Sequence, residues 1–203
     1  MKIIAIGRNY AAHAKELNNP VPDKPVIFLK PDTAVLKDDK PFYIPEFSSE
    51  IHYELEVVLK ICKEGKHISE KFAANYYDEI GLGIDFTARD IQNIHKEQGL
   101  PWELAKAFDH SAAISKFIPK TEFTDIKDLD FELKINGESR QIGNTKNLLF
   151  SFEQIIAFVS QYITLKKGDL IFTGTPEGVG KINKTDRLAA WLENRQLLDF
   201  DIK

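Results

Sequence analysis

The hydrophobic positions of this chain fall mostly in runs of five to nine residues, the length of buried β-strands. Each run is rich in Ile, Val, Phe or Leu and is bounded by Gly, Pro, Asn or Asp, which favour turns. The alternating run over 130–135 precedes Asn136-Gly137, a dipeptide typical of two-residue hairpins. The pattern therefore predicts a hairpin there and six strands, over 2–6, 26–30, 54–62, 80–85, 130–135 and 169–173.

Helical periodicity is found in fewer places. The clearest segment is 151–162, where Phe152, Ile155, Ile156 and Val159 recur at helical spacing after Ser151, a plausible cap. Two further helices are predicted over 10–17 and 88–98, which end at Asn18-Asn19-Pro20 and Gly99-Leu100-Pro101. Strands and helices do not alternate regularly, which argues against a doubly wound sheet. We expect a mixed α/β fold, mostly β, with a few packed helices in one domain over 1–203.

Composition and charge narrow the class of protein. The 203 residues are 43% hydrophobic and 29% charged, with a net charge of −4 and a pI near 5.8. Lysines are scattered among acids, so we expect no nucleic-acid partner. No apolar stretch approaches the ~20 residues needed to cross a bilayer, and Gly7-Arg8-Asn9 interrupts the first apolar run too early for a signal peptide. We therefore expect no membrane segment and a cytoplasmic location.

The single cysteine, Cys62, excludes an internal disulfide and suits a reducing compartment. It follows an apolar run, which favours a buried, inert thiol over a nucleophile.

The first candidate for chemistry is the segment 50–58, which carries two glutamates within an apolar strand. On a strand, Glu54 and Glu56 share a face with His52, and their backbone positions lie roughly 6.5–7 Å apart. One interpretation is a strand with a solvated face. The alternative is a bound cation, which would relieve the repulsion between like charges among apolar neighbours and would use carboxylate oxygens as ligands.

A third acid, Asp85, stands where an apolar strand gives way to a helix. It could cap that helix, as could Thr87. It could instead be a third oxygen ligand, leaving positions open for water and substrate. Such an all-carboxylate set favours Mg²⁺ or Mn²⁺ over zinc, and the histidines form no zinc-type cluster, since they stand at 13, 52, 67, 95 and 110.

The predicted helix over 10–17 offers a candidate base. His13 and Glu16 are three residues apart, so on a helix they share a face and can hydrogen-bond. A carboxylate that orients an imidazole fixes its tautomer and raises its basicity, as a general base requires. The pair could equally be a surface ion pair.

Taken together, these motifs resemble the fumarylacetoacetate hydrolase family, and within it the short single-domain branch related to acylpyruvases. The similarity runs from about residue 4 to residue 180, and its motifs occur in the family's order. They are Gly7-Arg8-Asn9-Tyr10 with His13 and Glu16, the segments 25–31, 52–56, 85–90 and 106–109, Asn136-Gly137-Glu138 with 141–145, and 173–180. The stretch 191–203 departs from the family, which tends to end in a glycine-containing strand.

This resemblance implies a site and a fold. Glu54, Glu56 and Asp85 would bind Mg²⁺, with Mn²⁺ as a substitute, and His13 with Glu16 would activate water. Lys106 would contact the substrate's oxygen atoms as a third catalytic residue. The fold would be the family's β-sandwich roll, in a homodimer, with the His13–Glu16 segment as a lid. The expected substrate-binding residues are Arg8, Tyr10, Gln92 and Thr175.

The substrate implied is a small 2-oxo acid whose carboxylate and 2-oxo oxygen could chelate the metal. We expect hydrolysis of an acylpyruvate to pyruvate and a carboxylic acid, or decarboxylation of oxaloacetate. An isomerase or tautomerase of 2-oxo dioic acids is the main alternative, and a catalytically silent oxo-acid-binding protein is a remote one. The glycines of 170–180 do not have the spacing of a phosphate-binding loop, because no Gly-Lys precedes Ser or Thr.

Overall fold

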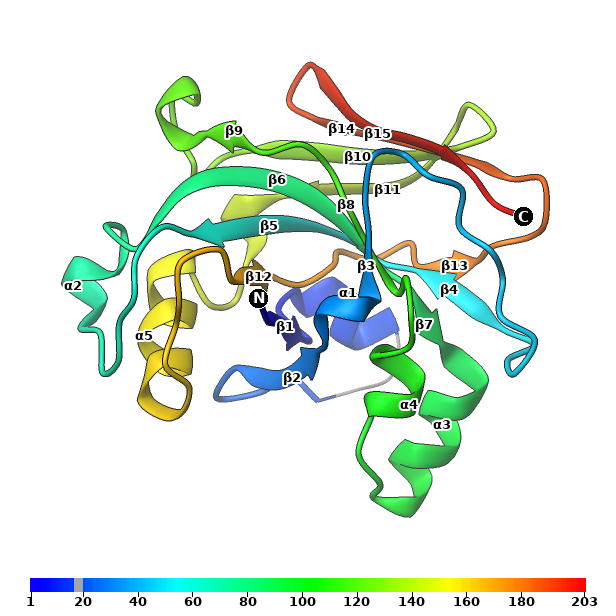
Figure 1. The fold of residues 1–203 in the computed structure, drawn as a ribbon, viewed down its shortest axis with the longest axis horizontal. Helices are drawn as coiled ribbons and strands as arrows, with labels where there is room; N and C mark the ends of the chain where they lie inside the picture. The colour runs from blue at the N-terminus through cyan, green and yellow to red at the C-terminus, as the bar shows by residue number, and fades with distance from the viewer. Residues whose placement is uncertain (17–19) are drawn as a thin grey trace.

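Sheets form most of the fold in the computed structural model, which describes residues 1–16 and 20–203 (Figure 1). The largest sheet has the order β2-β1-β12-β5-β6-β8-β3, and β9 pairs with β6 beside this path. Its strands are β1 (Ile3–Gly7), β2 (Val26–Lys30), β3 (Val35–Leu36), β5 (Leu55–Ile61), β6 (Tyr77–Asp85), β8 (Ala112–Ile114), β9 (Ile118–Pro119) and β12 (Leu170–Phe172).

A second sheet covers the long, curved strands β5 and β6 (Figure 1). It has the order β11-β10-β14-β15 and contains β10 (Asp130–Ile135), β11 (Glu138–Asn144), β14 (Arg187–Leu192) and β15 (Arg195–Asp201). A small third sheet, β13-β4-β7, joins β4 (Ile51–Tyr53), β7 (Thr87–Ala88) and β13 (Gly180–Lys181).

Strand β5 is buried on both faces, which explains its nearly continuous apolar sequence. Val57 and Leu59 belong to the main core, which also contains Leu133 and Leu188 from the second sheet. Val58 points the other way, into a smaller core formed with residues of β1 and β12. A charged side chain in the first part of this strand, before Lys60, is therefore enclosed by the core on both sides.

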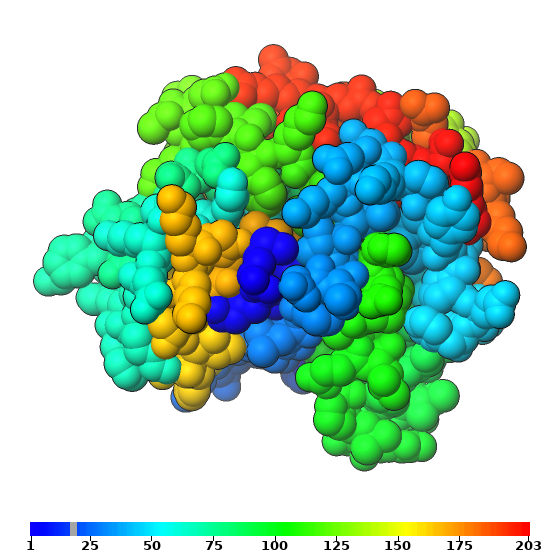
Figure 2. Space-filling view, viewed as in Figure 1, coloured from blue at the N-terminus to red at the C-terminus, as the bar shows by residue number. Residues whose placement is uncertain are grey.

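The helices lie at the ends and edges of the sheets. They are α1 (Ala11–Glu16), α2 (Glu70–Ala73), α3 (Arg89–Gln98), α4 (Glu103–Lys106) and α5 (Phe152–Tyr162), with short 3-10 turns at Asp32–Ala34, Lys120–Glu122 and Thr145–Asn147. Helices α3 and α4 project together as the green lobe in Figure 2. None of the helices in the described ranges is long and apolar enough to span a membrane.

Helix α5 forms as the sequence predicts. The Ser151 hydroxyl accepts a hydrogen bond from the backbone amide of Gln154, and the Gln154 side-chain oxygen accepts one from the backbone amide of Ser151, so the start of the helix has a full capping box. Ile155, Ile156 and Val159 are all fully buried against the core. The cap and the apolar stripe together place this helix.

The predicted mixed, mostly β fold is confirmed, and all six predicted strands occur with slightly shifted ends. The hairpin at Asn136-Gly137 is confirmed too: both residues have positive φ, 54° and 84°, as a two-residue turn requires. The chain after residue 186 forms the hairpin β14–β15, which pairs with β10. The expected break at Asn18-Asn19, with Leu17 before it, lies outside the described residues.

The prediction for Cys62 was wrong. The residue follows the last residue of β5 and is only half-buried, and its thiol lies 3.5 Å from the carbonyl oxygen of Asn75. Apolar neighbours in the sequence do not reveal that the strand reaches the edge of the core at this point.

Candidate active site

The two central strands of the large sheet bring three carboxylates together. Leu55 lies opposite Ile84, and the amide of Asp85 donates to the carbonyl of Glu54 at 2.8 Å, so Glu54 and Asp85 are neighbours across the strands. Glu56 follows two residues after Glu54 on the same face. One carboxylate oxygen from each of Glu54, Glu56 and Asp85 lies within 4.8 Å of the others. We call this group the carboxylate triad.

The triad is deeply buried, which excludes the solvated strand face. Glu54 is 5% exposed, Glu56 is 2% exposed and Asp85 is fully buried. The chain passes from β4 to β5 at Glu54, at the edge of the small sheet. Asp85 does not cap helix α3, since Ala88 holds the cap position without a side-chain bond. Three acids this close and this dry require positive partners.

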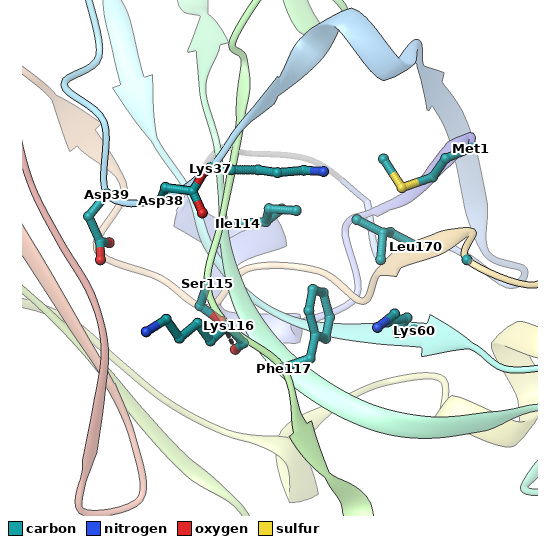
Figure 3. A pocket seen from close by; sticks show the side chains of 11 residues that line it. Met1, Lys37, Asp38, Asp39, Lys60, Ile114, Ser115, Lys116, Phe117 and Leu170 are labelled. Atoms are coloured by element: carbon teal, nitrogen blue, oxygen red, sulfur yellow. Dashed lines mark hydrogen bonds between the residues drawn. The ribbon is translucent and has the colours of Figure 1, made fainter.

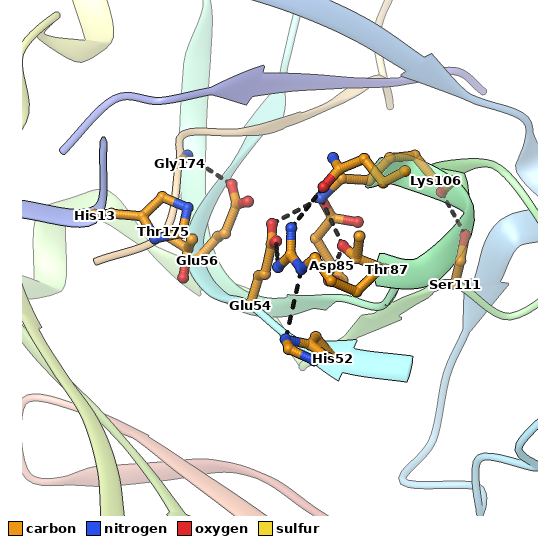
Figure 4. Close-up of polar contacts among 12 residues, drawn as sticks. His13, His52, Glu54, Glu56, Asp85, Thr87, Lys106, Ser111, Gly174 and Thr175 are labelled. Atoms are coloured by element: carbon orange, nitrogen blue, oxygen red, sulfur yellow. Dashed lines mark hydrogen bonds and ion pairs between the residues drawn. The ribbon is translucent and has the colours of Figure 1, made fainter. Parts of the chain in front are cut away.

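Lys106 is one of these partners (Figure 4). Its ammonium lies 2.7 Å from both Glu54 and Asp85 and donates to the Thr87 hydroxyl at 2.6 Å. Burial lowers the pKa of Lys106, but attraction to Asp85 and Glu54 outweighs it, so the net shift is upward. Lys106 is therefore held as a cation at the triad, where the sequence placed it.

Two further cations complete the neutralisation. The fully buried Lys30 lies 2.7 Å from the other oxygen of Asp85, and it also donates to the carbonyls of Lys106 and Ser111. Arg89 donates to Glu54 at 2.5 Å and to the Gln92 side chain at 2.6 Å. The triad's three negative charges thus face three positive ones.

These partners affect the two glutamates in opposite ways. Burial would raise the pKa of Glu54, but Lys106, Arg89 and His13 outweigh it and hold that pKa below its usual range. Burial and the charge of Asp85 raise the pKa of Glu56 well above its usual range, against the backbone amide of Gly174. Glu56 is thus the least compensated acid of the three.

Gly174 supports Glu56 from the opposite loop, donating its amide at 2.6 Å. Its φ is +107°, and a Cβ there would lie 2.6 Å from the Cβ of Asn9. Only glycine can combine this conformation with this close approach. The glycine segment after β12 therefore supplies an amide that binds a carboxylate.

The predicted contact between His13 and Glu16 is present. His13 is buried, and its Nδ1 lies 3.1 Å from Glu16. The other oxygen of Glu16 accepts the amide of Gly178 at 3.0 Å, so the carboxylate joins helix α1 to the loop after β12. With Nδ1 occupied by Glu16, Nε2 is the nitrogen left to accept a proton. The imidazole is buried and the carboxylate is exposed, so Glu16 orients His13 from the surface side.

Thr175 is held by a residue to which the sequence assigned no role. Gln141 donates to the Thr175 hydroxyl at 2.8 Å and to the carbonyl of Pro176 at 3.0 Å, and accepts from the amide of Leu55 at 2.9 Å. It thus connects β11, the loop and the start of β5. All of this takes place in the interior, since both side chains are buried.

A pocket opens onto the triad and is lined by seven of the ten predicted site residues; His13, Glu16 and Tyr10 do not line it. Its walls include Arg8, Gln92 and Thr175, as the sequence predicted for substrate binding. Tyr10 does not line this pocket: its ring packs edge-on against Phe131 in the main core, and the residue borders a different cavity. The remaining lining residues are Ile6, Gly7, Phe28, Glu54, Glu56, Asp85, Arg89, Lys96, Trp102 and Lys106.

A more open cavity lies elsewhere, between Met1, Lys37, Lys60, Phe117 and Leu170 (Figure 3). None of the predicted site residues lines it. Lys60 is already paired with Glu79 at 2.5 Å, outside the set of residues that surround the cavity. The chemistry of the molecule is concentrated in the narrower pocket at the triad.

Sequence reasoning missed Lys30, Arg89, Gln141 and Gly174 as site residues, although each lies in a quoted motif. A signal existed for Lys30, a single charge that ends an otherwise apolar strand, and for Arg89, which precedes Gln92 by one helical turn. The contact between Gln141 and Thr175 had no local signal because it joins distant segments.

Comparisons with known proteins agree with this geometry. The family model described as "Fumarylacetoacetate (FAA) hydrolase C-terminal" matches residues 2–203. The chain is 43% identical over 201 residues to the mitochondrial oxaloacetate tautomerase of Mus musculus, covering 99% of this chain and 91% of the relative. It is 43% identical over 182 residues to the mitochondrial oxaloacetate decarboxylase of Dictyostelium discoideum, covering 89% and 84%.

Among solved structures, the fumarylpyruvate hydrolase of Pseudomonas aeruginosa, crystallised with Mn²⁺ and pyruvate, superposes with a TM-score of 0.94 at 33% identity. The match covers 100% of this chain and 89% of that one. Sequence, fold and site therefore agree: this chain belongs to the fumarylacetoacetate hydrolase family.

Proposed function

We propose that this protein is a metal-dependent enzyme that breaks a carbon–carbon bond in 2-oxo acids, by hydrolysing acylpyruvates or by decarboxylating oxaloacetate. The observation that carries the proposal is a buried carboxylate triad that holds the Lys106 ammonium, with the imidazole of His13 close enough to lower the pKa of Glu54. The close-up in Figure 4 shows His13 on the Glu56 side of the triad. The names of the Dictyostelium and Pseudomonas relatives support the same two reactions.

The donor set fits a hard divalent cation. Glu54, Glu56 and Asp85 offer only oxygen atoms, within 4.8 Å of one another, and such a set favours Mg²⁺, with Mn²⁺ as a substitute. When bound, the cation supplies positive charge that polarises a carbonyl and stabilises developing negative charge. Within the described residues, Glu54 and Asp85 have paired cations and Glu56 has none, so the positive charge of a bound metal would be shared between Glu56 and the substrate.

This distribution of charge favours an anionic substrate whose 2-oxo oxygen gains negative charge as it reacts. A 2-oxo acid brings a carboxylate, and cleavage next to its carbonyl leaves an electron pair that passes onto the 2-oxo oxygen. Lys106, held as a cation in a buried site, would stabilise that charge. In the proposal, Arg8, Gln92 and Thr175 orient the substrate within the pocket.

For an acylpyruvate, His13 Nε2 would accept a proton from a water whose oxygen attacks the acyl carbonyl. The bond between that carbon and C3 then breaks, C3 regains a proton, and the products are a carboxylic acid and pyruvate. For oxaloacetate, loss of CO₂ gives the same enolate with no attacking water. The two reactions therefore differ in how strongly they need His13.

A second activity, keto–enol interconversion of oxaloacetate, is favoured by the name of the Mus musculus relative. It requires proton transfer at C3 and no bond cleavage between carbons. The same charged pocket could stabilise the enolate that both activities share. Decarboxylation releases pyruvate, whereas tautomerisation releases none and only lowers the absorbance of the enol. Measuring pyruvate therefore distinguishes the two reactions.

The test incubates purified protein and Mg²⁺ with acetylpyruvate and with oxaloacetate, with and without EDTA. We expect pyruvate from at least one acid and loss of the activity with EDTA. No pyruvate from either acid would refute the bond-breaking proposal, and enol decay alone would leave the tautomerase. Full Mg²⁺-dependent activity in Glu54→Ala would refute the metal assignment.

The homodimer and the cytoplasmic location stay predictions from the sequence. Light scattering after size exclusion tests the first, and fractionation of cells that express the protein tests the second. The Mus musculus and Dictyostelium relatives are named as mitochondrial proteins, which makes the second test informative.

A further inference from the structure

The mouth of the active-site pocket carries two cations that the triad does not use. Arg8 and Lys96 both line the pocket, together with Trp102. Neither forms an ion pair with any residue in 1–16 or 20–203, whereas Arg89 and Lys106 each pair with the triad. Two half-buried positive charges thus face the same space without a negative partner from the described chain.

Both charged groups lie near the ring of Trp102. The Arg8 guanidinium lies 6.0 Å from the centre of its ring and the Lys96 ammonium lies 5.8 Å from it. Cations at this distance from an aromatic face are attracted to it, so the ring orients both groups. Trp102 packs in turn on Phe28, at 6.0 Å between centroids, and the Lys106 ammonium lies 5.1 Å from the Phe28 ring. The two rings therefore connect the outer cations to the inner site.

The backbone holds Arg8 in an unusual conformation. Its φ is +60°, in the left-handed region that non-glycine residues rarely adopt. The fully buried Asn9 maintains this turn through bonds to Phe150 and to the Thr173 carbonyl. A strained residue that is fixed by its neighbours and faces a pocket is typical of functional sites.

The local field at the mouth is positive despite the nearby acids. Burial, Arg89, Arg8 and Lys106 lower the pKa of Lys96 and Glu54 raises it, and the net result is a pKa of about 8. Positive neighbours outweigh the negative one at this position. An anion placed here would be attracted by both groups.

We propose that Arg8 and Lys96, held beside Trp102, form a second anion-binding position that takes the distal carboxylate of a short 2-oxo dicarboxylic acid. The inference rests on the proposed function, because it assumes that the 2-oxo end of the substrate meets the triad. It makes dicarboxylic acids the preferred substrate class over acylpyruvates with an uncharged tail. Selectivity then comes from residues that do not touch the reacting carbons.

The test measures binding, so that it does not depend on turnover. Calorimetry with Mg²⁺ compares 2-oxoglutarate with 2-oxopentanoate, which lacks the distal carboxylate. We expect the wild type to bind 2-oxoglutarate about tenfold tighter, and Lys96→Met to reduce that preference to about threefold or less. Lys96→Arg should keep it. Lys71→Met, which removes an exposed charge from the remote helix α2, should change nothing.

Two results would overturn the proposal: equal binding of the two acids by the wild type, or a full preference in Lys96→Met. If Lys96→Met fails to fold by circular dichroism, Lys96→Gln takes its place. A protein that shows the preference but releases no pyruvate would keep the anion position and lose the proposed reaction. Binding of neither acid would overturn the anion position, while pyruvate release from oxaloacetate or acetylpyruvate would still decide the proposed reaction.

Discussion

The two halves of the site are built in different ways. The carboxylate triad and its three cations stand on or beside strands of the large sheet, inside the hydrophobic core. The His13–Glu16 dyad stands on α1, a helix of six residues, and hydrogen bonds tie it to the loop after β12. The strand half is fixed by the fold itself, whereas the helix half is fixed by local contacts. Damage to the first should therefore cost stability as well as activity, and damage to the second mainly activity.

The strongest test of this difference is Asp85→Asn. The change leaves Lys30 and Lys106 buried without their shared anion, which should lower the free energy of unfolding by about 3–5 kcal/mol. Loss of this proposed metal ligand should also lower kcat/KM for oxaloacetate by at least about 10³-fold. Urea unfolding and pyruvate release measure the two effects. Asp78→Asn, exposed on the same strand, is the matched control, and an equal effect there would contradict the argument.

His13→Ala tests the other half. Without its base, hydrolysis of acetylpyruvate should slow by at least about 10²-fold, while Mg²⁺ affinity stays within about twofold of wild type. Decarboxylation of oxaloacetate should fall less, because it needs no attacking water. Kinetics with both acids and calorimetry with Mg²⁺ check this, with the exposed Lys15→Ala on the same helix as control. Loss of metal binding in His13→Ala would show that the halves are not separable.

Gly174→Ala tests the loop after β12, which contacts both halves of the site. The added Cβ meets Asn9 at 2.6 Å and forces a residue with φ of +107° into strain, so we expect a loss of about 1–3 kcal/mol in unfolding free energy. Gly168→Ala has a similar φ of +88° but an unobstructed Cβ, so it isolates the backbone cost. Mg²⁺ affinity should fall several-fold in Gly174→Ala alone, because the backbone shift that relieves the clash with Asn9 moves the residue-174 amide away from Glu56. Equal effects in both variants would refute the role of the close approach.

The smallest expected effect concerns pH and separates the outer cations from both halves. Lys96, which faces Arg8, Arg89, Lys106 and Glu54, has a pKa lowered to about 8 and loses its charge as pH rises through that value. The preference for 2-oxoglutarate over 2-oxopentanoate should therefore be full below pH 8 and decline above it, by a few-fold. Calorimetry at several pH values measures it. In Lys96→Arg the preference should stay constant, and a parallel decline there would assign the titration to another group.

Much of the strand half could be predicted from the sequence. Two glutamates at strand spacing among apolar neighbours, and an aspartate at the end of the next apolar run, carry their own signal. The register that places Asp85 opposite Glu54 cannot be read from the local sequence, because strand pairing depends on the whole sheet. The buried cation Lys30 was missed for the same reason: its partner Asp85 lies on a distant strand.

For the helix half, the sequence predicted the contact between its two residues but not the contacts that they make with the rest of the molecule. The spacing of His13 and Glu16 indicates the contact between them, but nothing local indicates that Gly178 binds Glu16. Tyr10 shows the limit of motif reasoning, since it neighbours the site in sequence and packs on Phe131 instead. Side-chain direction at the start of a short helix is set by the core it meets.

Asn9 has a consequence for how the molecule is assembled. It bonds to Phe150 and Thr173, more than 140 positions later in the chain, and the strand before it pairs in parallel with Leu170–Phe172. Contacts of such sequence separation form late and slow the folding of a domain. During synthesis, the segment around Asn9 must therefore wait until residues 150–173 have been made before it finds its place. The proposed catalytic dyad, His13 and Glu16, would then become ordered late in folding.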